Sequence, residues 1–198
     1  MDKTVLITGG TSGLGLATSK LFAAKGATVI VAARSRERFN TNLDSSHGKV
    51  TFIETDFNDM AAVKRLHAEI QHKYPPIDIA INNVGVASMK PFLAYTEAEF
   101  DHTFNVNLKS LWLSMKLQIP MMLEDSQNPK HIINISSING LGGADYLSLY
   151  AAAKAGVISL TKSAALEHAA SNISINTVVP GPFDTPMLND ALSHQANG

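Results

Sequence analysis

Short runs of β-branched and other apolar residues alternate along this chain with longer amphipathic segments, and this order constrains the fold more than any other feature. The short runs lack a polar alternation, which is typical of strands buried on both faces of a parallel sheet. The predicted strands are Thr4–Ile7, Thr28–Ala32, Val50–Glu54, Ile77–Ile81, His131–Ile135 and Ile173–Val178.

The segments between these strands have apolar residues at helical spacing. Thr96 with Glu99 forms a capping-box pattern that predicts a helix start, and Gly26 is a typical residue at a helix end. Strands that alternate with helices predict an α/β fold, a doubly wound parallel sheet of the Rossmann type with helices on both faces. The predicted helices are Gly13–Lys25, Asn58–Lys73, Glu97–Leu123 and Leu147–Ala170.

Length and composition favour one globular domain. The chain has 198 residues, of which 45% are hydrophobic and 17% are charged. This length suits a single domain, and this composition disfavours a disordered chain. We expect one nucleotide-binding domain over residues 1–198, with a frayed tail at residues 193–198.

Charge balance and the absence of cysteine exclude several classes of function. Lys and Arg number 16 against 17 for Asp and Glu, so no basic excess favours nucleic acid as a partner. Without cysteine there is no disulfide or thiolate site, and His67 and His72 do not share a helix face, so we expect no metal. The sequence has neither a secretory signal nor an apolar run of about 20 residues, which predicts a cytoplasmic protein without a membrane partner.

A glycine-rich segment, TGGTSGLG over residues 8–15, follows the first predicted strand and precedes a helix. In this position backbone N–H groups and the helix N-terminus can bind a pyrophosphate. The spacing is not that of the G-x-G-x-x-G pattern, and a glycine-rich turn without a ligand is the alternative. The residues expected to bind the cofactor here are Gly9, Thr11, Ser12, Gly13, Leu14 and Gly15.

The end of the second predicted strand favours NADP over NAD. In dinucleotide-binding folds an acidic residue about 20 positions beyond the glycine-rich loop bonds the ribose 2′-OH. Ala33 and Arg34 occupy this point instead, and a guanidinium suits a 2′-phosphate. We interpret Arg36 and Arg38 as the solvated start of a helix. NAD is the alternative cofactor.

Polar residues follow other predicted strands at the same edge. Asp56 is expected either to bond the adenine amino group or to cap the next helix. Asn83 and Gly85 either lie under the cofactor or form a turn. Asn107 and a second asparagine share one turn of the long predicted helix, and asparagine is unfavourable there, which indicates a local distortion.

Tyr150 and Lys154 lie one turn apart on one face of a predicted helix. An ammonium next to a phenol lowers a phenol pKa that is ordinarily near 10, which would make Tyr150 an acid/base near neutral pH. A chance pair with a surface lysine is the alternative. Ser137 ends the fifth predicted strand, and its hydroxyl could hold a substrate oxygen or cap the strand.

In order and spacing these residues resemble the short-chain dehydrogenase/reductase family from residue 4 to about residue 187. The resemblance implies hydride transfer between nicotinamide C4 and a carbonyl or secondary alcohol. It implies that Tyr150 is the general acid/base, that Ser137 holds the substrate oxygen and that Lys154 also bonds the nicotinamide ribose.

The same resemblance implies two further contacts. Asn107 would hold a water of the proton relay, and Thr185 with the backbone at Pro180 and Gly181 would hold the nicotinamide carboxamide. Family members usually continue through a further strand and helix, whereas this sequence ends at Gly198, so we expect a C-terminally short member with a reduced substrate lid.

Three functions share this fold, and the residues favour the first. An NADP-preferring oxidoreductase would act on a small apolar carbonyl compound or alcohol. A nucleotide-binding protein without turnover would not need all four of the polar residues Asn107, Ser137, Tyr150 and Lys154. A sugar-nucleotide isomerase would need a second domain. The expected apolar lining of the substrate site is Val86, Met89, Leu141, Tyr146, Phe183 and Met187.

The helix predicted over Leu147–Ala170 is small or apolar on more than one face. One face can cover the sheet, and the second needs another partner. Pairing with the helix Glu97–Leu123 across a two-fold axis would bury both. We therefore expect a homodimer or homotetramer.

Overall fold

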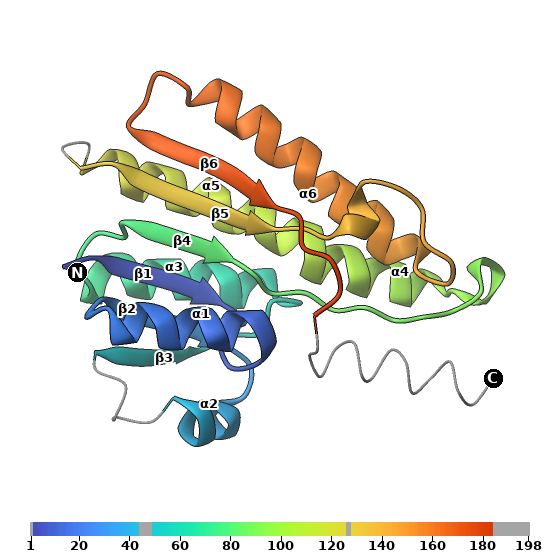
Figure 1. Cartoon of the computed structure of the whole chain (residues 1–198), viewed down its shortest axis with the longest axis horizontal. Helices are drawn as coiled ribbons and strands as arrows, with labels where there is room; N and C mark the ends of the chain where they lie inside the picture. The colour runs from blue at the N-terminus through green and yellow to red at the C-terminus, as the bar shows by residue number, and fades with distance from the viewer. Residues whose placement is uncertain (1, 44–48, 126–127, 184–198) are drawn as a thin grey trace.

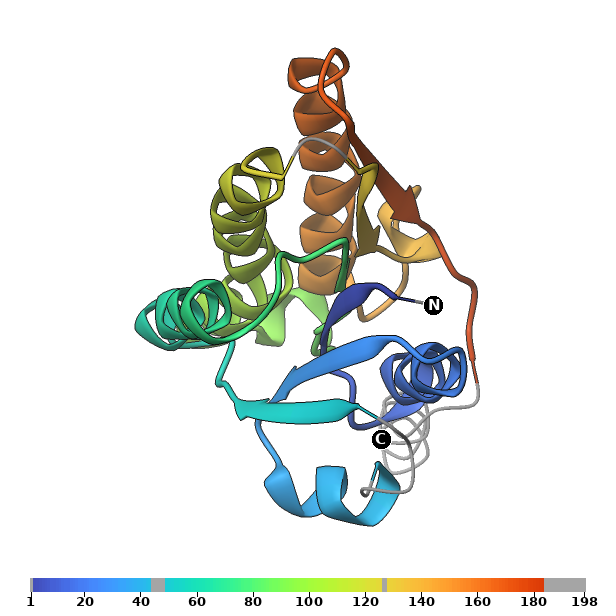
Figure 2. The ribbon, with the colours of Figure 1, turned by 90° about the vertical axis from the view of Figure 1, so that its left-hand side faces the viewer.

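A computed structural model describes residues 2–43, 49–125 and 128–183, and it contains one parallel sheet between two helical layers (Figures 1 and 2). The strand order is β3-β2-β1-β4-β5-β6, and every neighbouring pair is parallel. This order confirms the predicted doubly wound fold. The strands are β1 (Thr4–Thr8), β2 (Thr28–Ala33), β3 (Val50–Glu54), β4 (Ile79–Asn82), β5 (Lys130–Ile135) and β6 (Ile173–Val178).

Helices cover the sheet from both sides, with α3, α5 and α6 in a row on one side and α1 on the other (Figure 2). The chain direction brings the carboxyl ends of all the strands to one edge (Figure 1). Ligands of such sheets bind at this edge. The helices are α1 (Gly13–Ala24), α2 (Arg36–Asn42), α3 (Met60–Lys73), α4 (Glu97–Phe104), α5 (Ser110–Leu123) and α6 (Ser148–Glu167), with short 3₁₀ turns η2 (Phe92–Ala94) and η4 (Ile138–Gly140).

The central strands are apolar on both faces because each face has its own helical layer. On β1, Val5 and Ile7 pack in the cluster that contains Ala23 of α1, whereas Leu6 packs with Leu66 of α3 and the apolar residues of α5. The three β1 residues are fully buried. Alternate side chains of one strand therefore belong to two cores.

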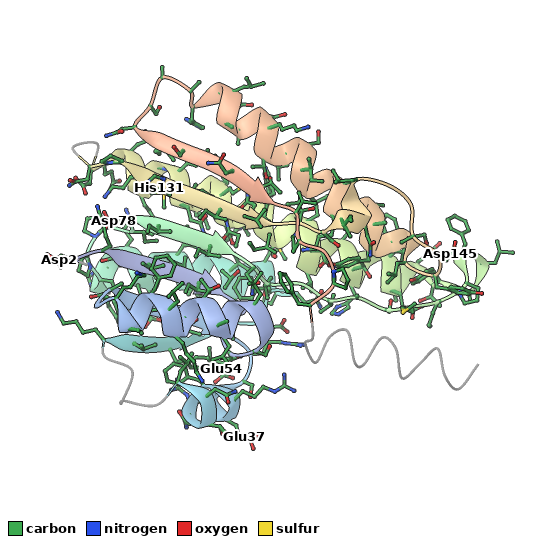
Figure 3. All side chains as sticks on the ribbon, viewed as in Figure 1. Asp2, Glu37, Glu54, Asp78, His131 and Asp145 are labelled. Atoms are coloured by element: carbon green, nitrogen blue, oxygen red, sulfur yellow. The ribbon has the colours of Figure 1, made fainter. Side chains whose placement is uncertain are left out.

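The prediction that every strand is buried on both faces is wrong for β5 and β6. In β6, Ile173 and Ile175 are buried, but Ser174 and Asn176 are exposed, and His131 of β5 is exposed on the same side (Figure 3). The reason is that α1 packs on β1 and β2 and does not reach this part of the sheet. Burial here depends on the tertiary placement of α1, which the strand sequences do not encode.

Two predicted helix ends have the expected geometry. Gly26 has φ 78°, its N–H donates to the Ala23 carbonyl, and the Ala27 N–H donates to the Phe22 carbonyl, which together form a Schellman motif. At the start of α4, Thr96 and Glu99 form the predicted capping box. Both signals are local in sequence, so the sequence alone is enough to locate them.

The long helix predicted over Glu97–Leu123 is interrupted by a π-helical turn, η3 (Asn105–Lys109), between α4 and α5. This is the turn in which two asparagines indicated a distortion. A π turn widens the hydrogen-bonding pattern and is frequent at functional sites.

A chain of buried polar side chains crosses the core below the ligand edge. Asn82 and Gln118 exchange two amide hydrogen bonds of 3.0 and 2.9 Å, and Asn82 also donates to Asn134. Asn134 donates to Thr161 of α6, and the far end of the chain is His67 of α3, 3.3 Å from the Gln118 amide nitrogen. Each member is at most 3% exposed. The network joins α3, α5, β4, β5 and α6.

At the opposite edge of the sheet, ion pairs join the amino ends of the strands (Figure 3). Lys130 is 1% exposed and its ammonium lies 3.1 Å from Asp78 and 2.6 Å from Asp125. Asp78 also accepts from Lys3 and from the Thr4 N–H. Burial by itself would raise the pKa of Asp78, but these donors outweigh it and lower that pKa.

In the part of the chain that the structure describes, no helix has both the length and the apolarity to cross a membrane.

Candidate active site

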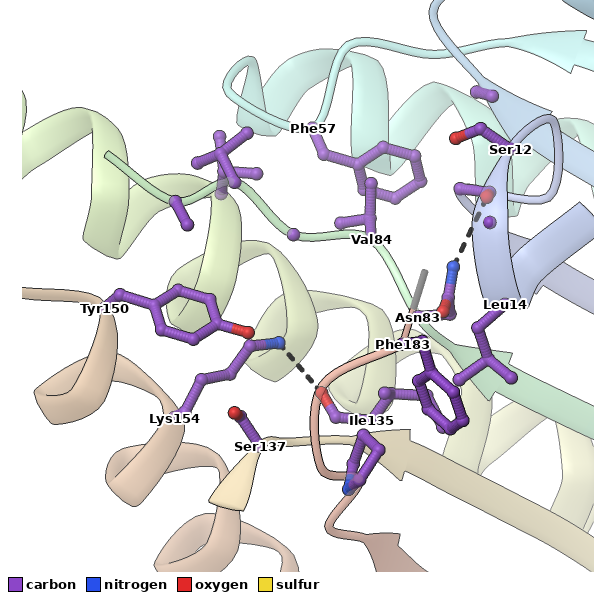
Figure 4. Close-up of a pocket in the computed structure, with 18 of the residues that line it drawn as sticks. Ser12, Leu14, Phe57, Asn83, Val84, Ile135, Ser137, Tyr150, Lys154 and Phe183 are labelled. Atoms are coloured by element: carbon purple, nitrogen blue, oxygen red, sulfur yellow. Dashed lines mark hydrogen bonds between the residues drawn. The ribbon is translucent and has the colours of Figure 1, made fainter. Parts of the chain in front are cut away.

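A cavity of about 830 Å³ lies at the carboxyl ends of the strands (Figure 4). Residues from the glycine-rich loop form one end and residues from β5 and α6 form the other. Of the predicted site residues, the cavity wall contains Gly9, Thr11, Ser12, Gly13, Leu14, Arg34, Asp56, Asn83, Gly85, Ser137, Tyr150, Lys154, Pro180 and Gly181. Gly15 and Asn107 lie behind the wall, and Thr185 is outside the described residues.

The glycine-rich loop has the conformation that its sequence requires. Gly9 and Gly13 have φ of 68° and 50°, in the left-handed region that favours glycine. A Cβ on Gly15 would lie 2.3 Å from the Gly9 carbonyl oxygen, so Gly15 allows the helix start to pack against the loop. The loop is thus held close to its own helix, with its backbone facing the cavity.

Asn83 fixes this loop from the neighbouring strand. Its side-chain amide donates to the carbonyl oxygens of Thr8 and Gly9, at 3.1 and 3.3 Å. In return, the Thr8 hydroxyl accepts from the N–H groups of Asn83 and Val84. Asn83 therefore both lines the cavity and holds the loop in place. The sequence alone could not distinguish a position at the cofactor from a simple turn.

Beyond the glycine-rich loop, where β2 ends, the structure adds two charged residues to Arg34. Arg38 and Glu37 of α2 also line the wall, whereas Arg36 lies over the Phe52 ring at 4.8 Å. The interpretation of Arg38 as only a solvated helix residue therefore does not account for its place in the cavity wall. The register of the short helix α2 decides which arginine faces the cavity, and no periodicity in a seven-residue helix shows that register.

Asp56 lies in the cavity wall, where the adenine contact remains a prediction, and the alternative that it caps the next helix is wrong. It lines the cavity, and its carboxylate accepts from the Asn58 N–H at 2.9 Å in the turn before α3. The helix itself is capped by Asp59, which accepts from Ala61. The neighbouring Phe57, which the sequence did not single out, is 2% exposed and lines the same wall.

Lys154 is a buried cation that faces Tyr150. Its side chain is 3% exposed, and its ammonium donates to the Ile135 carbonyl at 2.9 Å and lies 5.7 Å from the centre of the Tyr150 ring (Figure 4). Burial lowers the pKa of Lys154 to about 8. Lys154 is therefore not a surface lysine, which was the alternative considered from the sequence.

Tyr150 and Ser137 meet at the same wall. Burial raises the pKa of Tyr150, and a hydrogen bond with the Ser137 hydroxyl acts in the opposite direction. The expected lowering of the Tyr150 pKa by Lys154 is not observed, since burial dominates and the Lys154 ammonium donates to the Ile135 carbonyl. The Ser137 hydroxyl also accepts from the Asn139 N–H at 3.2 Å, so it both caps η4 and faces the phenol.

Asn107 is fully buried in the π turn η3 and supports the wall from behind. Its carbonyl oxygen accepts from the Val86 N–H, and its amide donates to the carbonyl oxygens of Val86 and Thr103. A Cβ on Gly85 would lie 2.9 Å from the Asn107 side-chain oxygen and 3.4 Å from the Lys154 nitrogen. Gly85 therefore allows these two side chains to approach the same backbone segment.

The wall around Tyr150 is mostly apolar, with Val86, Val106, Ile138 and Leu147 among its residues, whereas Phe183 lines the cavity beside Leu14 (Figure 4). Three residues predicted to line the substrate site, Met89, Leu141 and Tyr146, are not in it, and Met187 is outside the described residues. In the loop before α6, Tyr146 has φ 62° and its carbonyl accepts from the Lys90 N–H and the Tyr95 hydroxyl.

Comparisons of the sequence and of the fold with known proteins point to the same family. A family profile described as short chain dehydrogenase matches residues 3–196. A 3-oxoacyl-[acyl-carrier-protein] reductase from Thermotoga maritima is 37% identical over 188 residues, which are 93% of this chain and 76% of that protein.

Two solved structures have the same architecture. A levodione reductase superposes with a TM-score of 0.93 at 32% identity and covers all of this chain and 78% of its own. A variant of actinorhodin polyketide ketoreductase, determined with NADPH, has a TM-score of 0.92 at 27% identity and covers 99% of this chain and 76% of its own.

Proposed function

This chain belongs to the short-chain dehydrogenase family and is an oxidoreductase, and on that basis we propose that it transfers a hydride between NADP(H) and the carbonyl or secondary alcohol of a small apolar substrate. The observation that carries the proposal is that Tyr150, Lys154 and Ser137 meet at one wall of the cavity whose other end is the glycine-rich loop. One cavity thus joins a phosphate-binding end to an acid/base end.

The residues fit a nicotinamide dinucleotide. The glycine-rich loop lines the cavity at the start of α1, where backbone N–H groups and the helix N-terminus can bind a pyrophosphate. Asp56 and Phe57 line the wall expected for the adenine. Near the other end, Lys154 presents the buried ammonium that would hold the nicotinamide ribose.

The preference for NADP(H) rests on two guanidinium groups. Arg34 and Arg38 line one end of the cavity, and a 2′-phosphate accepts bidentate hydrogen bonds from such groups. Glu37 lines the same end and adds one negative charge against these two positive charges. The related ketoreductase whose structure contains NADPH supports the same preference by similarity.

The proposed mechanism assigns proton transfer to Tyr150. When bound, the nicotinamide supplies or accepts the hydride. The Tyr150 hydroxyl donates a proton to the substrate oxygen as its charge develops, while the Ser137 hydroxyl holds that oxygen. The ammonium of Lys154 stabilises the phenolate that remains. We assign Asn107 and the backbone of Pro180 and Gly181 to supporting the proton relay and the nicotinamide.

The apolar wall around Tyr150 supports a small apolar substrate. Apart from Lys154, which we assign to the nicotinamide ribose and the phenolate, the neighbouring Val86 and Val106 offer no charged group to a substrate at this end. The 3-oxoacyl and levodione substrates in the names of similar proteins belong to those proteins, but both contain a ketone. A ketone is therefore the first substrate class to test, followed by aldehydes and quinones.

Tyr150→Phe tests the proposal. We expect oxidation of NADPH by a panel of ketones to fall by about 10²–10⁴-fold, since the proton donor is lost, whereas NADPH binding measured by fluorescence stays within twofold of the original. Tyr74→Phe, at the end of α3 and outside the cavity wall, is the matched control. Turnover by Tyr150→Phe near the level of the control would remove Tyr150 from this role.

A further inference from the structure

Three successive residues at the end of β5 face the same turn of α6. The Ile135 carbonyl accepts from the Lys154 ammonium, and the Ser137 side chain lies in the same cavity wall as Tyr150 (Figure 4). Between them, the Ser136 hydroxyl donates to the backbone carbonyl of Lys154 at 2.8 Å. Of these three residues, Ser136 is the one whose hydrogen bond is made to the helix backbone, so it acts on the position of the turn itself.

The Ser136 bond is not needed to complete α6. Lys154 lies inside the helix, where its carbonyl has the ordinary acceptor role of an interior residue, and a carbonyl oxygen has a second lone pair for the hydroxyl. Ser136 is 2% exposed, so its hydroxyl would otherwise be a buried donor without this acceptor. The bond therefore links strand to helix at one defined height.

Gly140 confines the same backbone from another direction. A Cβ at this position would lie 2.7 Å from the Lys154 carbonyl carbon and 2.9 Å from the Ala155 nitrogen. The end of β5 and the start of the loop that follows it thus contact one peptide group of α6. A helix that carries an acid/base pair needs such a fixed height, because reactions are sensitive to displacements of about 1 Å.

We propose that Ser136 is a positioning residue that fixes the Tyr150–Lys154 turn of α6 through its bond to the Lys154 carbonyl. The inference rests on the proposed function, because it assigns the reaction to that turn. Ser136 does not touch the reacting atoms in this role. Its loss should act on the rate of the chemical step and on the exposure of Lys154, and not on substrate binding.

Ser136→Ala and Thr161→Val form the matched pair for the test. Thr161 is a buried hydroxyl of the same helix that also links it to β5, by accepting from Asn134, and it bonds Val157 within the helix. Both variants remove one strand-to-helix hydrogen bond, but only the first removes the bond at Lys154. Ser136→Cys nearly preserves the side-chain volume and replaces the hydroxyl with a weak donor.

We expect kcat for NADPH-dependent reduction to fall about 10-fold in Ser136→Ala and Ser136→Cys, with KM for the carbonyl substrate unchanged. The basic limb of the pH–rate profile should move to higher pH, because a displaced Lys154 stabilises the Tyr150 phenolate less. Thr161→Val should keep kcat and the pH profile of the original protein. A similar fall of kcat in Thr161→Val, or no fall in Ser136→Ala and Ser136→Cys, would overturn the proposal.

A measurement without turnover separates this proposal from the proposed function. Acetylation of Lys154 by acetic anhydride, followed by mass spectrometry, should be about fivefold faster in Ser136→Ala than in Thr161→Val, because the turn opens more often. If the original protein reduces no ketone, aldehyde or quinone, the proposed function fails, and the labelling rates still decide the role of Ser136. Equal labelling of the two variants would refute that role.

Discussion

At the scale of single residues, the buried charge of Lys154 couples stability to pH. Its pKa in the folded protein is about 8, lowered by burial from an ordinary value of 10.5. Below pH 8 the lysine is charged in both states, and the folded state bears the full cost of the buried charge. Between about pH 8 and 10.5 the unfolded state binds more protons, so stability rises with pH and the cost disappears.

Lys154→Met removes this dependence. At pH 7 we expect the variant to have a free energy of unfolding higher than that of the original by up to about 3 kcal/mol, which is the shift of Lys154 expressed as energy. The difference should shrink as pH approaches 10.5. Urea unfolding of both proteins at pH 7, 8, 9 and 10 measures it. A difference that does not change with pH would show that the buried charge is not its source.

The cofactor preference is also decided by single side chains. Arg34→Ala and Arg38→Ala should each weaken NADPH binding by about 10-fold, since each removes a charge-assisted contact, and should leave NADH binding unchanged. Arg36→Ala is the control, because Arg36 lies over Phe52 instead of lining the cavity. Fluorescence titration with both cofactors checks this prediction. Equal or tighter binding of NADH than of NADPH by the original protein would refute the NADP preference.

At the scale of elements, the buried amide network ties α3 to α6 through a histidine. Burial lowers the pKa of His67, although the contact with the Val63 carbonyl acts against it. Neutral His67 can donate to Val63 and accept from the Gln118 amide. A protonated ring would place an N–H against the Gln118 amide donor. Acid should therefore weaken the contact between α3 and α5, through which the network continues to α6.

We expect stability to fall as pH drops below 6.5, where the unfolded histidine takes up a proton that the folded one resists. His67→Leu should remove up to about 1.4 kcal/mol per pH unit of this slope. The same substitution at exposed His72 of α3 is the control. Thermal unfolding at pH 7, 6 and 5 gives the slopes. Identical slopes for His67→Leu and the original would exclude His67 as the acid-sensitive group.

Local signals in the sequence predicted the elements and the glycine-rich loop, because each depends on neighbours within a few positions. The capping box at Thr96 and the helix end at Gly26 are examples. Features that depend on packing were not predictable in this way. Arg38 faces the cavity through the register of α2, and Ser136 reaches Lys154 across 18 positions of the chain.

At the scale of the whole molecule, the exposed face of α6 suggests where a second copy would bind. Ala155 and Ser159 are exposed on this helix, and Trp112 of α5 is 44% exposed beside it. A groove lined by Trp112, Leu108, Gly156 and Leu160 separates the two helices. Small side chains permit close approach of another helix pair, which supports the proposed two-fold dimer.

Ala155→Arg should convert the dimer to a monomer without unfolding the sheet, because a long charged side chain would enter the contact. Ala68→Arg, on an exposed position of α3, is the control and should not dissociate the protein. Light scattering at micromolar concentration, with circular dichroism as the check on folding, measures both. A monomer of 21.2 kDa for the original protein would refute the predicted assembly.

The bonds between Asn83 and the glycine-rich loop have a consequence for the order in which the protein is built. Thr8 ends β1 and Asn83 directly follows β4, 75 positions later, and these strands become neighbours only after three strand–helix–strand connections have formed. A growing chain can make β1, α1 and β2 early, but the loop gains these fixed partners only when β4 docks beside β1. We therefore expect tight binding of the proposed cofactor to be a late event in folding, which would report that the two halves of the sheet have joined.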